Sequence, residues 1–248
     1  MKLTVVGCSG SFGGAMSATS CYLLEAEGFR LLLDLGAGAL GELAKHTDIY
    51  GIDALLLSHL HPDHCIDMCG YYVARAYRPE GPVPRLPVWG PGNTPARMAA
   101  AYGLPEDPGM TAQFDFRTMS PGAIFEVGPL RVTLDRTVHP VEAYAIRVEH
   151  GGKAFTYSGD SGICENLVKL ARNSDLFLCE ASFHEGRDFF PDVHLTGREA
   201  AEHAERAEVP RLLLTHIPPW NDPARTLSEA ADFPGRVDLA CPGATYDI

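Results

Sequence analysis

Residues 58–64 read Ser58-His59-Leu60-His61-Pro62-Asp63-His64, which places three imidazoles and a carboxylate within a few positions. Nitrogen and oxygen ligands of this kind suit borderline-soft divalent metal ions. In an extended segment His59 and His61 point to the same side, because side chains alternate along a strand. Pro62 then bends the chain, so that Asp63 and His64 can face a second centre at the start of a helix. The stretch therefore predicts a site for two metal ions.

The residues around this stretch predict an α/β chain. Residues 54–58 form a short apolar run, typical of a strand buried on both faces, and ligand sites in α/β sheets favour the carboxyl ends of such strands. The stretch 78–92 is rich in proline and glycine, which favours a loop or an irregular edge over a helix or a central strand. Further strands are expected at 2–6, 21–25, 30–35, 130–134, 143–149, 154–157, 176–179 and 211–215, and helices at 164–171 and 197–207.

A pair of metal ions needs more ligands, and three candidates follow expected strands. They are His139 in Thr137-Val138-His139-Pro140, Asp160 in Tyr157-Ser158-Gly159-Asp160, and His216 in Leu214-Thr215-His216-Ile217. A lone histidine is more often a packed core residue, but the joint pattern favours a metal-binding role for all three.

Length and composition limit the class of protein. With 248 residues, of which 46% are hydrophobic, the chain is expected to form a single domain over residues 1–248. The seven cysteines are an odd number without a CxxC pair, which favours reduced thiols, with Cys65 and Cys69 as packing residues. No segment resembles a signal peptide or a bilayer-spanning helix, so a cytoplasmic location without a membrane partner is expected. The formal charge of -12 disfavours a polyanionic partner such as nucleic acid without excluding it.

Taken together, these residues resemble the metallo-β-lactamase superfamily, whose pattern is HxHxDH followed at long range by a His, an Asp and a final His. The resemblance covers essentially the whole chain and implies an α/β fold, the four-layer αββα sandwich. It also implies two divalent ions, with zinc expected and manganese or iron as alternatives for the same ligands. The implied ligands are His59, His61 and His139 for one ion and Asp63, His64 and His216 for the other, with Asp160 bridging them.

Two later segments narrow the resemblance to the RNase Z-like phosphodiesterase branch. These are Leu178-Cys179-Glu180-Ala181-Ser182 and Asp192-Val193-His194-Leu195-Thr196. The branch implies that Glu180 orients His194, which donates to the phosphate or the leaving oxygen. Within the branch the chain is similar to bacterial atypical, class II-like cyclic-nucleotide phosphodiesterases, notably in the closing run His216-Ile217-Pro218-Pro219-Trp220. It departs from them at residues 12–17, where the family has a proline-containing turn.

The function implied by this resemblance is hydrolysis of a small cyclic phosphodiester by metal-hydroxide attack at phosphorus. A 3′,5′-cyclic nucleotide such as cAMP is the expected substrate, and Asp63, His194 and Glu180 are the expected catalytic residues. A tRNA 3′-end processing endonuclease and a non-catalytic metal-binding scaffold are the alternatives. A lactamase or a thioesterase is a weaker alternative. Oligomeric state stays open, although relatives in this branch commonly form homodimers.

Other polar motifs are expected to be structural. Residues 36–41 form a literal GxGxxG, but the acidic residue of a dinucleotide fingerprint is missing at the end of the next strand, so a strand-to-helix turn with a helix starting near Ala39 is favoured. His46, His150 and His203 are expected at the surface. His184 lies between Glu180 and His194, where a solvated loop is favoured over a substrate contact.

Overall fold

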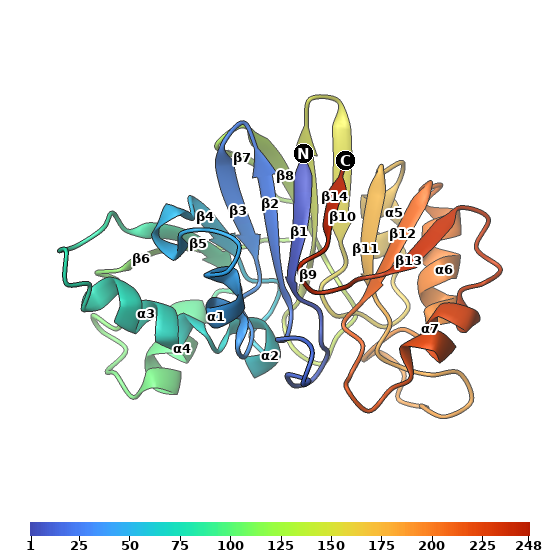
Figure 1. Cartoon of the computed structure of the whole chain (residues 1–248), viewed down its shortest axis with the longest axis horizontal. Coiled ribbons are helices and arrows are strands. Elements are labelled where there is room, and N and C mark those ends of the chain that lie inside the picture. Colours follow the sequence, from blue (N-terminus) through green and yellow to red (C-terminus); the bar gives the residue numbers. More distant parts are fainter.

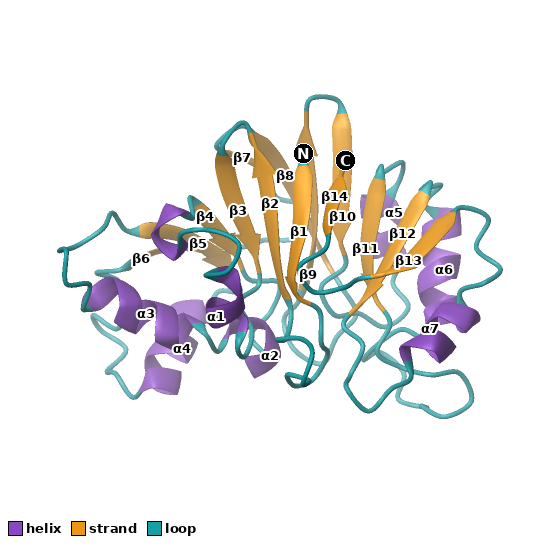
Figure 2. Ribbon diagram, viewed as in Figure 1, coloured by secondary structure: helices purple, strands orange, loops and turns teal.

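Two seven-stranded sheets face each other in the computed structural model, which describes residues 1–248 (Figures 1 and 2). The first sheet has the order β14-β1-β2-β3-β4-β5-β6 and the second β13-β12-β11-β10-β9-β8-β7. The strands of the first sheet are β1 (Lys2–Gly7), β2 (Cys21–Ala26), β3 (Phe29–Leu33), β4 (Ala54–Leu56), β5 (Leu86–Gly90), β6 (Phe114–Thr118) and β14 (Thr245–Asp247). Those of the second are β7 (Ile124–Val127), β8 (Leu130–Arg136), β9 (Tyr144–His150), β10 (Lys153–Tyr157), β11 (Leu176–Glu180), β12 (Arg211–Thr215) and β13 (Arg236–Leu239).

Helices cover the outer face of each sheet and complete the four-layer αββα sandwich predicted for the chain (Figure 2). The first sheet carries α1 (Ala39–Leu43), α2 (Pro62–Cys65), α3 (Met68–Ala76) and α4 (Thr94–Tyr102), with a 3-10 turn at Ile49–Gly51. The second carries α5 (Glu165–Ala171), α6 (Gly197–Arg206) and α7 (Pro223–Glu229). None of these helices is long and apolar enough to cross a bilayer.

Three apolar cores hold the four layers together. The largest contains 23 buried residues and lies between the sheets, because both sheets turn apolar side chains inward. Clusters of 20 and 19 buried residues join each sheet to its own helices. This double burial explains the continuous apolar runs of β4 and β12, whose residues face a core on either side.

The expectation for residues 78–92 is wrong for the second part of that stretch. Strand β5 pairs in parallel with both β4 and β6, so it is an interior strand. Leu86, Val88 and Trp89 are buried, and this burial outweighs the single backbone donor that Pro87 removes from the sheet. Pro79, Pro82 and Pro84 lie in the loop before the strand, as predicted, and Pro91 follows it.

The carboxyl ends of the parallel strands position the polar residues of both sheets. Strands β3 and β4 are parallel, as are β10, β11 and β12. Asp34 follows β3, the histidine-rich stretch 58–64 follows β4, Asp160 follows β10, Glu180 ends β11, and His216 follows β12. The fold therefore gathers these side chains at one edge of the sandwich, the location that α/β sheets favour for ligand sites.

Candidate metal centre

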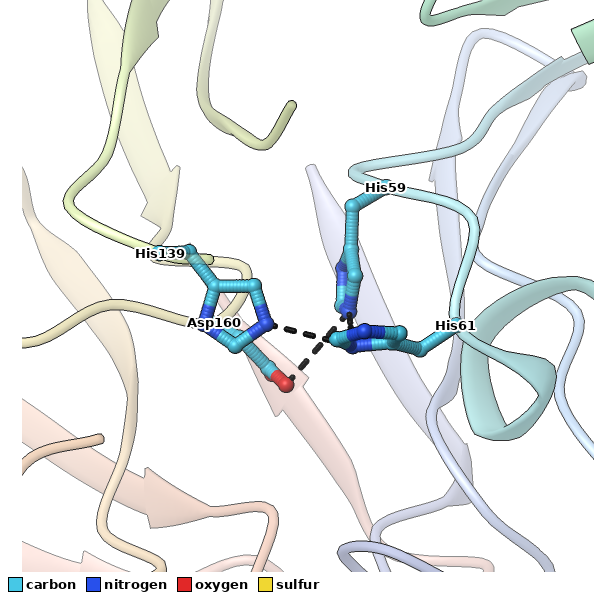
Figure 3. Close-up of side chains that lie close together, drawn as sticks. All are labelled: His59, His61, His139 and Asp160. Carbon is cyan, nitrogen blue, oxygen red and sulfur yellow. Dashed lines mark hydrogen bonds and ion pairs between the residues drawn. The ribbon is translucent and has the colours of Figure 1, made fainter. Parts of the chain in front are cut away.

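Four of the expected ligands converge on one point (Figure 3). His61 Nδ1 lies 3.1 Å from His59 Nε2 and 3.2 Å from His139 Nε2. Asp160 Oδ2 lies 3.5 Å from His59 Nε2. A tetrahedral zinc ion with ligand bonds of ~2.1 Å holds its ligand atoms ~3.4 Å apart. The spacing of these four atoms therefore fits a metal ion at their centre.

A second group lies beside the first and shares Asp160 with it. Asp63 Oδ2 is 3.6 Å from both His64 Nε2 and His216 Nε2. Asp160 Oδ1 is 3.2 Å from His64 Nε2, and its Oδ2 is 3.4 Å from His216 Nε2. Because its two oxygens face rings of both groups, Asp160 stands where a bridging carboxylate would stand.

Three atoms of these groups have no hydrogen-bond partner although they are buried. They are His64 Nε2, His216 Nε2 and Asp160 Oδ1. Orphaned buried polar atoms are rare, because each costs the free energy of its lost hydration. All three face the centre of the cluster, and divalent cations would satisfy them. The residues therefore fit the metal ions that the fold implies.

The ring nitrogens that face away from the cluster are hydrogen-bonded, which fixes how each imidazole is presented. The Nδ1 atoms of His59, His139 and His216 lie 3.1 Å from Ser58 Oγ, 2.9 Å from the carbonyl oxygen of Val193 and 2.9 Å from Ser20 Oγ, respectively. Such outer partners orient ligand histidines and set their tautomer. His61 differs, since it turns Nδ1 toward the cluster.

The sequence reasoning missed Asp34, which is fully buried behind His64. Its Oδ2 accepts hydrogen bonds from His64 Nδ1 at 2.7 Å and from the hydroxyls of Ser58 and Tyr157 at 2.8 and 2.7 Å. The backbone N–H of Ser58 donates to Oδ1 at 2.6 Å. The only sequence signal for Asp34 is a lone carboxylate inside the apolar run Leu31-Leu32-Leu33-Asp34-Leu35, part of the strand expected at 30–35.

The electrostatics of the cluster favour neutral rings around an ionised carboxylate. Burial lowers the pKa of His59, His61, His139 and His216. Burial works to raise the pKa of Asp160, but the rings of His216 and His64 outweigh it and hold that pKa well below its usual range. Neutral imidazole and ionised carboxylate are the forms that bind metal ions. His64 is the exception, because Asp160 and Asp34 outweigh its burial and raise its pKa.

His194 borders the cluster and is held by Glu180. Its Nδ1 lies 2.8 Å from Glu180 Oε1, and its ring centre is 5.6 Å from those of His139 and His216. Glu180 is fully buried, and it also accepts hydrogen bonds from the backbone N–H groups of Ser161 and Ser182. Burial works against the charged ring, but the carboxylate of Glu180 outweighs it and raises the pKa of His194 to about 9.

Residues 7–20 form part of the site, whereas the GxGxxG stretch serves as a turn. The backbone N–H of Ser11 donates to Asp63 Oδ2 at 2.9 Å. Helix α1 begins at Ala39 after Gly38, which has a positive φ of 81°, as expected for a strand-to-helix turn. Gly36 lies so near residue 63 that an added Cβ would stand 1.9 Å from the backbone oxygen of Asp63. This glycine allows the two ligand-bearing loops to meet.

Two of the remaining histidines differ from the expectation. His203 is buried, with Nε2 accepting from the backbone N–H of Cys164 and Nδ1 facing the carbonyl oxygen of Glu199. His184 is also buried rather than solvated, and its Nε2 lies 3.0 Å from Thr226 Oγ1. Both rings form hydrogen bonds with backbone or hydroxyl groups, and no periodicity in the sequence reveals these partners. His46 is exposed, as predicted.

Fold and site together define a metal-dependent hydrolase of the αββα type. The model of the beta-lactamase superfamily domain matches residues 30–217, so the chain belongs to the beta-lactamase superfamily.

An uncharacterized protein of Mycobacterium leprae is 44% identical over 254 residues, which cover 100% of this chain and 89% of that protein. The probable metallo-hydrolase YhfI of Bacillus subtilis is 29% identical over 257 residues and 100% of both chains. Its crystal structure superposes with a TM-score of 0.87 over 99% of this chain and 98% of YhfI. A ribonuclease Z of a Mycobacterium species is 28% identical over 265 residues, 96% of this chain and 93% of that enzyme.

Proposed function

We propose that this protein is a phosphodiesterase with two metal ions that hydrolyses a small cyclic phosphodiester, with a 3′,5′-cyclic nucleotide such as cAMP as the favoured substrate. The observation that carries the proposal is His194, whose Nδ1 is held by Glu180 at the edge of the cluster. A hydrolase that only needed to activate water would not require an oriented imidazole there. A proton donor at that place suits a leaving alkoxide.

The two ions, for which we favour zinc, would be held by the groups described above. His59, His61 and His139 would bind one ion, Asp63, His64 and His216 the other, and Asp160 both. When bound, such a pair lowers the pKa of water and offsets the negative charge that develops at phosphorus. The charge of -12 on the whole chain is then no obstacle to a small anion, because the bound ions would supply a positive local field at the site.

The chain's own groups would handle the protons. Asp63, fixed by the backbone N–H of Ser11, would orient the attacking water and accept a proton from it. His194 would give a proton from Nε2 to the leaving oxygen, since its Nδ1 is engaged by Glu180. The raised pKa of His194, about 9, keeps this proton on the ring at neutral pH.

A second candidate is tRNA 3′-end processing, favoured by the likeness to ribonuclease Z over nearly the whole chain. The same set of side chains would cut an RNA phosphodiester. The acidic charge of the chain argues against it, because nucleic acid binding draws most of its affinity from Lys and Arg contacts to phosphates.

Metal analysis combined with turnover tests the proposal. We expect about two zinc ions per chain and hydrolysis of cAMP in preference to a pre-tRNA. His59→Ala should lose one metal equivalent and nearly all activity, whereas His46→Ala, at an exposed histidine, should keep both. Cleavage of pre-tRNA with inert cAMP would favour the second candidate, and full activity of His59→Ala would exclude the metal-dependent mechanism.

A further inference from the structure

A cavity of about 380 Å³ opens beside His194, which is one of its lining residues. Its walls come from the loop of residues 183–192, which is part of the connection between β11 and α6, from Gly162 and Ile163 after β10, and from Thr196 and Glu199 at the start of α6. Figure 1 shows this loop at the lower right, next to α7. The volume is within the range of small-ligand sites, about 300–1,000 Å³.

Aromatic rings run from the metal cluster into this cavity. His194 lies between the cluster and Phe183, whose ring centre is 5.0 Å away, and Phe190 follows at 6.4 Å from Phe183. The side chain of Phe190 is 71% exposed and that of its neighbour Phe189 77%. Two large adjacent rings left in water are unusual, and exposed apolar groups of this kind mark binding surfaces.

The polar side chains of the cavity are mostly hydrogen-bond acceptors. Four carboxylate side chains line it, those of Glu185, Asp188, Asp192 and Glu199. Arg198 pairs with Glu185 and Arg187 with Asp188, so the carboxylates are partly neutralised, and His194 also borders the cavity. The carboxylates suit a neutral group with hydrogen-bond donors, such as hydroxyls or ring amines.

The loop is fastened to the metal cluster, so the cavity keeps a fixed place beside it. The carbonyl oxygen of Val193 lies 2.9 Å from His139 Nδ1. Gly162 lies against Asp192 so closely that an added Cβ would stand 2.7 Å from the Asp192 Cα. A substrate with its phosphodiester at the cluster would thus project its other end past His194 into the cavity.

We propose that this cavity binds the nucleoside part of the substrate, with the base stacked on Phe190 and the sugar or base donors facing the carboxylates. The inference rests on the proposed phosphodiesterase function and names the substrate class, a nucleoside phosphodiester. Flat apolar faces with hydrogen-bond donors at the rim describe a nucleobase, and stacking on an exposed ring is the general way in which proteins bind one. It makes Phe190 a specificity-determining residue.

The test separates base recognition from phosphodiester chemistry. Adenosine binding is measured by calorimetry on the metal-loaded protein, and kcat/KM is measured for cAMP and for 1,3-propanediol cyclic phosphate, which has the same six-membered phosphodiester ring without a base. The variants are Phe190→Ala, Phe190→Tyr, which keeps the ring, and Tyr77→Ala. Tyr77 is 69% exposed and follows α3 on the opposite flank of the molecule (Figure 1), so it is a matched control.

We expect Phe190→Ala to weaken adenosine binding and to lower kcat/KM for cAMP, each by about tenfold, the usual effect of removing one stacking ring. The base-free substrate should be unaffected, and Phe190→Tyr and Tyr77→Ala should resemble the wild type. Unchanged adenosine affinity in Phe190→Ala, no adenosine binding to the wild type, or an equal loss for both substrates overturns the inference. If adenosine binding depends on Phe190 but no phosphodiester is cleaved, the proposed activity fails while the nucleoside site stands.

Discussion

Replacing Asp34 with asparagine should release one metal ion and lower the free energy of unfolding. In the wild type this fully buried carboxylate accepts four hydrogen bonds, from the N–H and the hydroxyl of Ser58, from His64 Nδ1 and from the Tyr157 hydroxyl. Asparagine has the same shape but presents an NH₂ group in place of one oxygen, so it faces donors with donors. Both the ring of His64 and the junction between the sheets lose their support.

The size of the effect follows from these contacts. Breaking a buried charged network by removing one partner costs about 3–5 kcal/mol of unfolding free energy. Loss of an outer partner that orients a ligand histidine lowers metal affinity by about 10–100-fold. The loss should concern the ion bound by His64 and leave the ion of His59 and His61 in place, so the protein should retain about one ion after dialysis.

Urea unfolding of the metal-free protein and metal analysis after dialysis against a weak chelator measure the two effects separately. Asp53→Asn is the control, because Asp53 is exposed and accepts only a backbone hydrogen bond from Arg30. It should change neither quantity appreciably. An Asp34→Asn protein that keeps two ions with wild-type affinity would refute the role given to Asp34, even if its stability fell.

Three further results are expected. His194→Ala should lower kcat by about 10²–10⁴-fold with both metal ions retained, because general acid catalysis has an effect of this size. Glu180→Gln should move the alkaline fall of activity to lower pH, since the lost negative charge lowers the pKa of His194 from about 9. An unchanged pH–rate profile would contradict the pairing of Glu180 with His194. Gly36→Ala should destabilise the protein and release metal, because its Cβ would meet the Asp63 backbone oxygen at 1.9 Å, whereas Gly41→Ala, with open space around it, should not. Removing metal with a chelator should lower the melting temperature by about 10 °C, if the free ion exceeds its dissociation constant about 1,000-fold; an unchanged melting temperature by calorimetry argues against a bound ion.

The residue pattern predicts an α/β chain, the family resemblance implies the sandwich, and together they name residues that the fold brings together. Short apolar strands and the dense run of ligand-type side chains at 58–64 are local signals, which can be recognised without knowing the rest of the chain. His139, Asp160 and His216 were predictable only through the pattern that they share with that run. They follow the separate strands β8, β10 and β12, so their proximity depends on the order of strands in the sheet, which no short stretch of sequence contains.

Features that depend on tertiary partners were not predictable. Strand β5 forms despite Pro87 because it is buried between two neighbours. His203 and His184 lie in polar or helical sequence, yet they are buried because backbone and hydroxyl groups elsewhere in the chain complete their hydrogen bonds. The role of Asp34 was not predictable for the same reason, since its hydrogen-bond donors lie far along the chain, as Tyr157 does.

The proposed metal ligands and the proposed nucleoside cavity lie on separate parts of the chain. Polar contacts across the two sheets surround the cluster, with Tyr157 donating to Asp34 and Ser20 lying 2.9 Å from His216 Nδ1, so a change there disturbs the junction of the sheets. The loop 183–192 contributes none of the proposed ligands, and its following residue touches the cluster only through the carbonyl of Val193. Because a backbone carbonyl survives any side-chain replacement, this loop can change its aromatic and acidic residues without altering how His139 is held. If the proposed nucleoside site holds, substrate specificity would therefore vary at Phe190 and its neighbours while the hydrolytic chemistry stays the same.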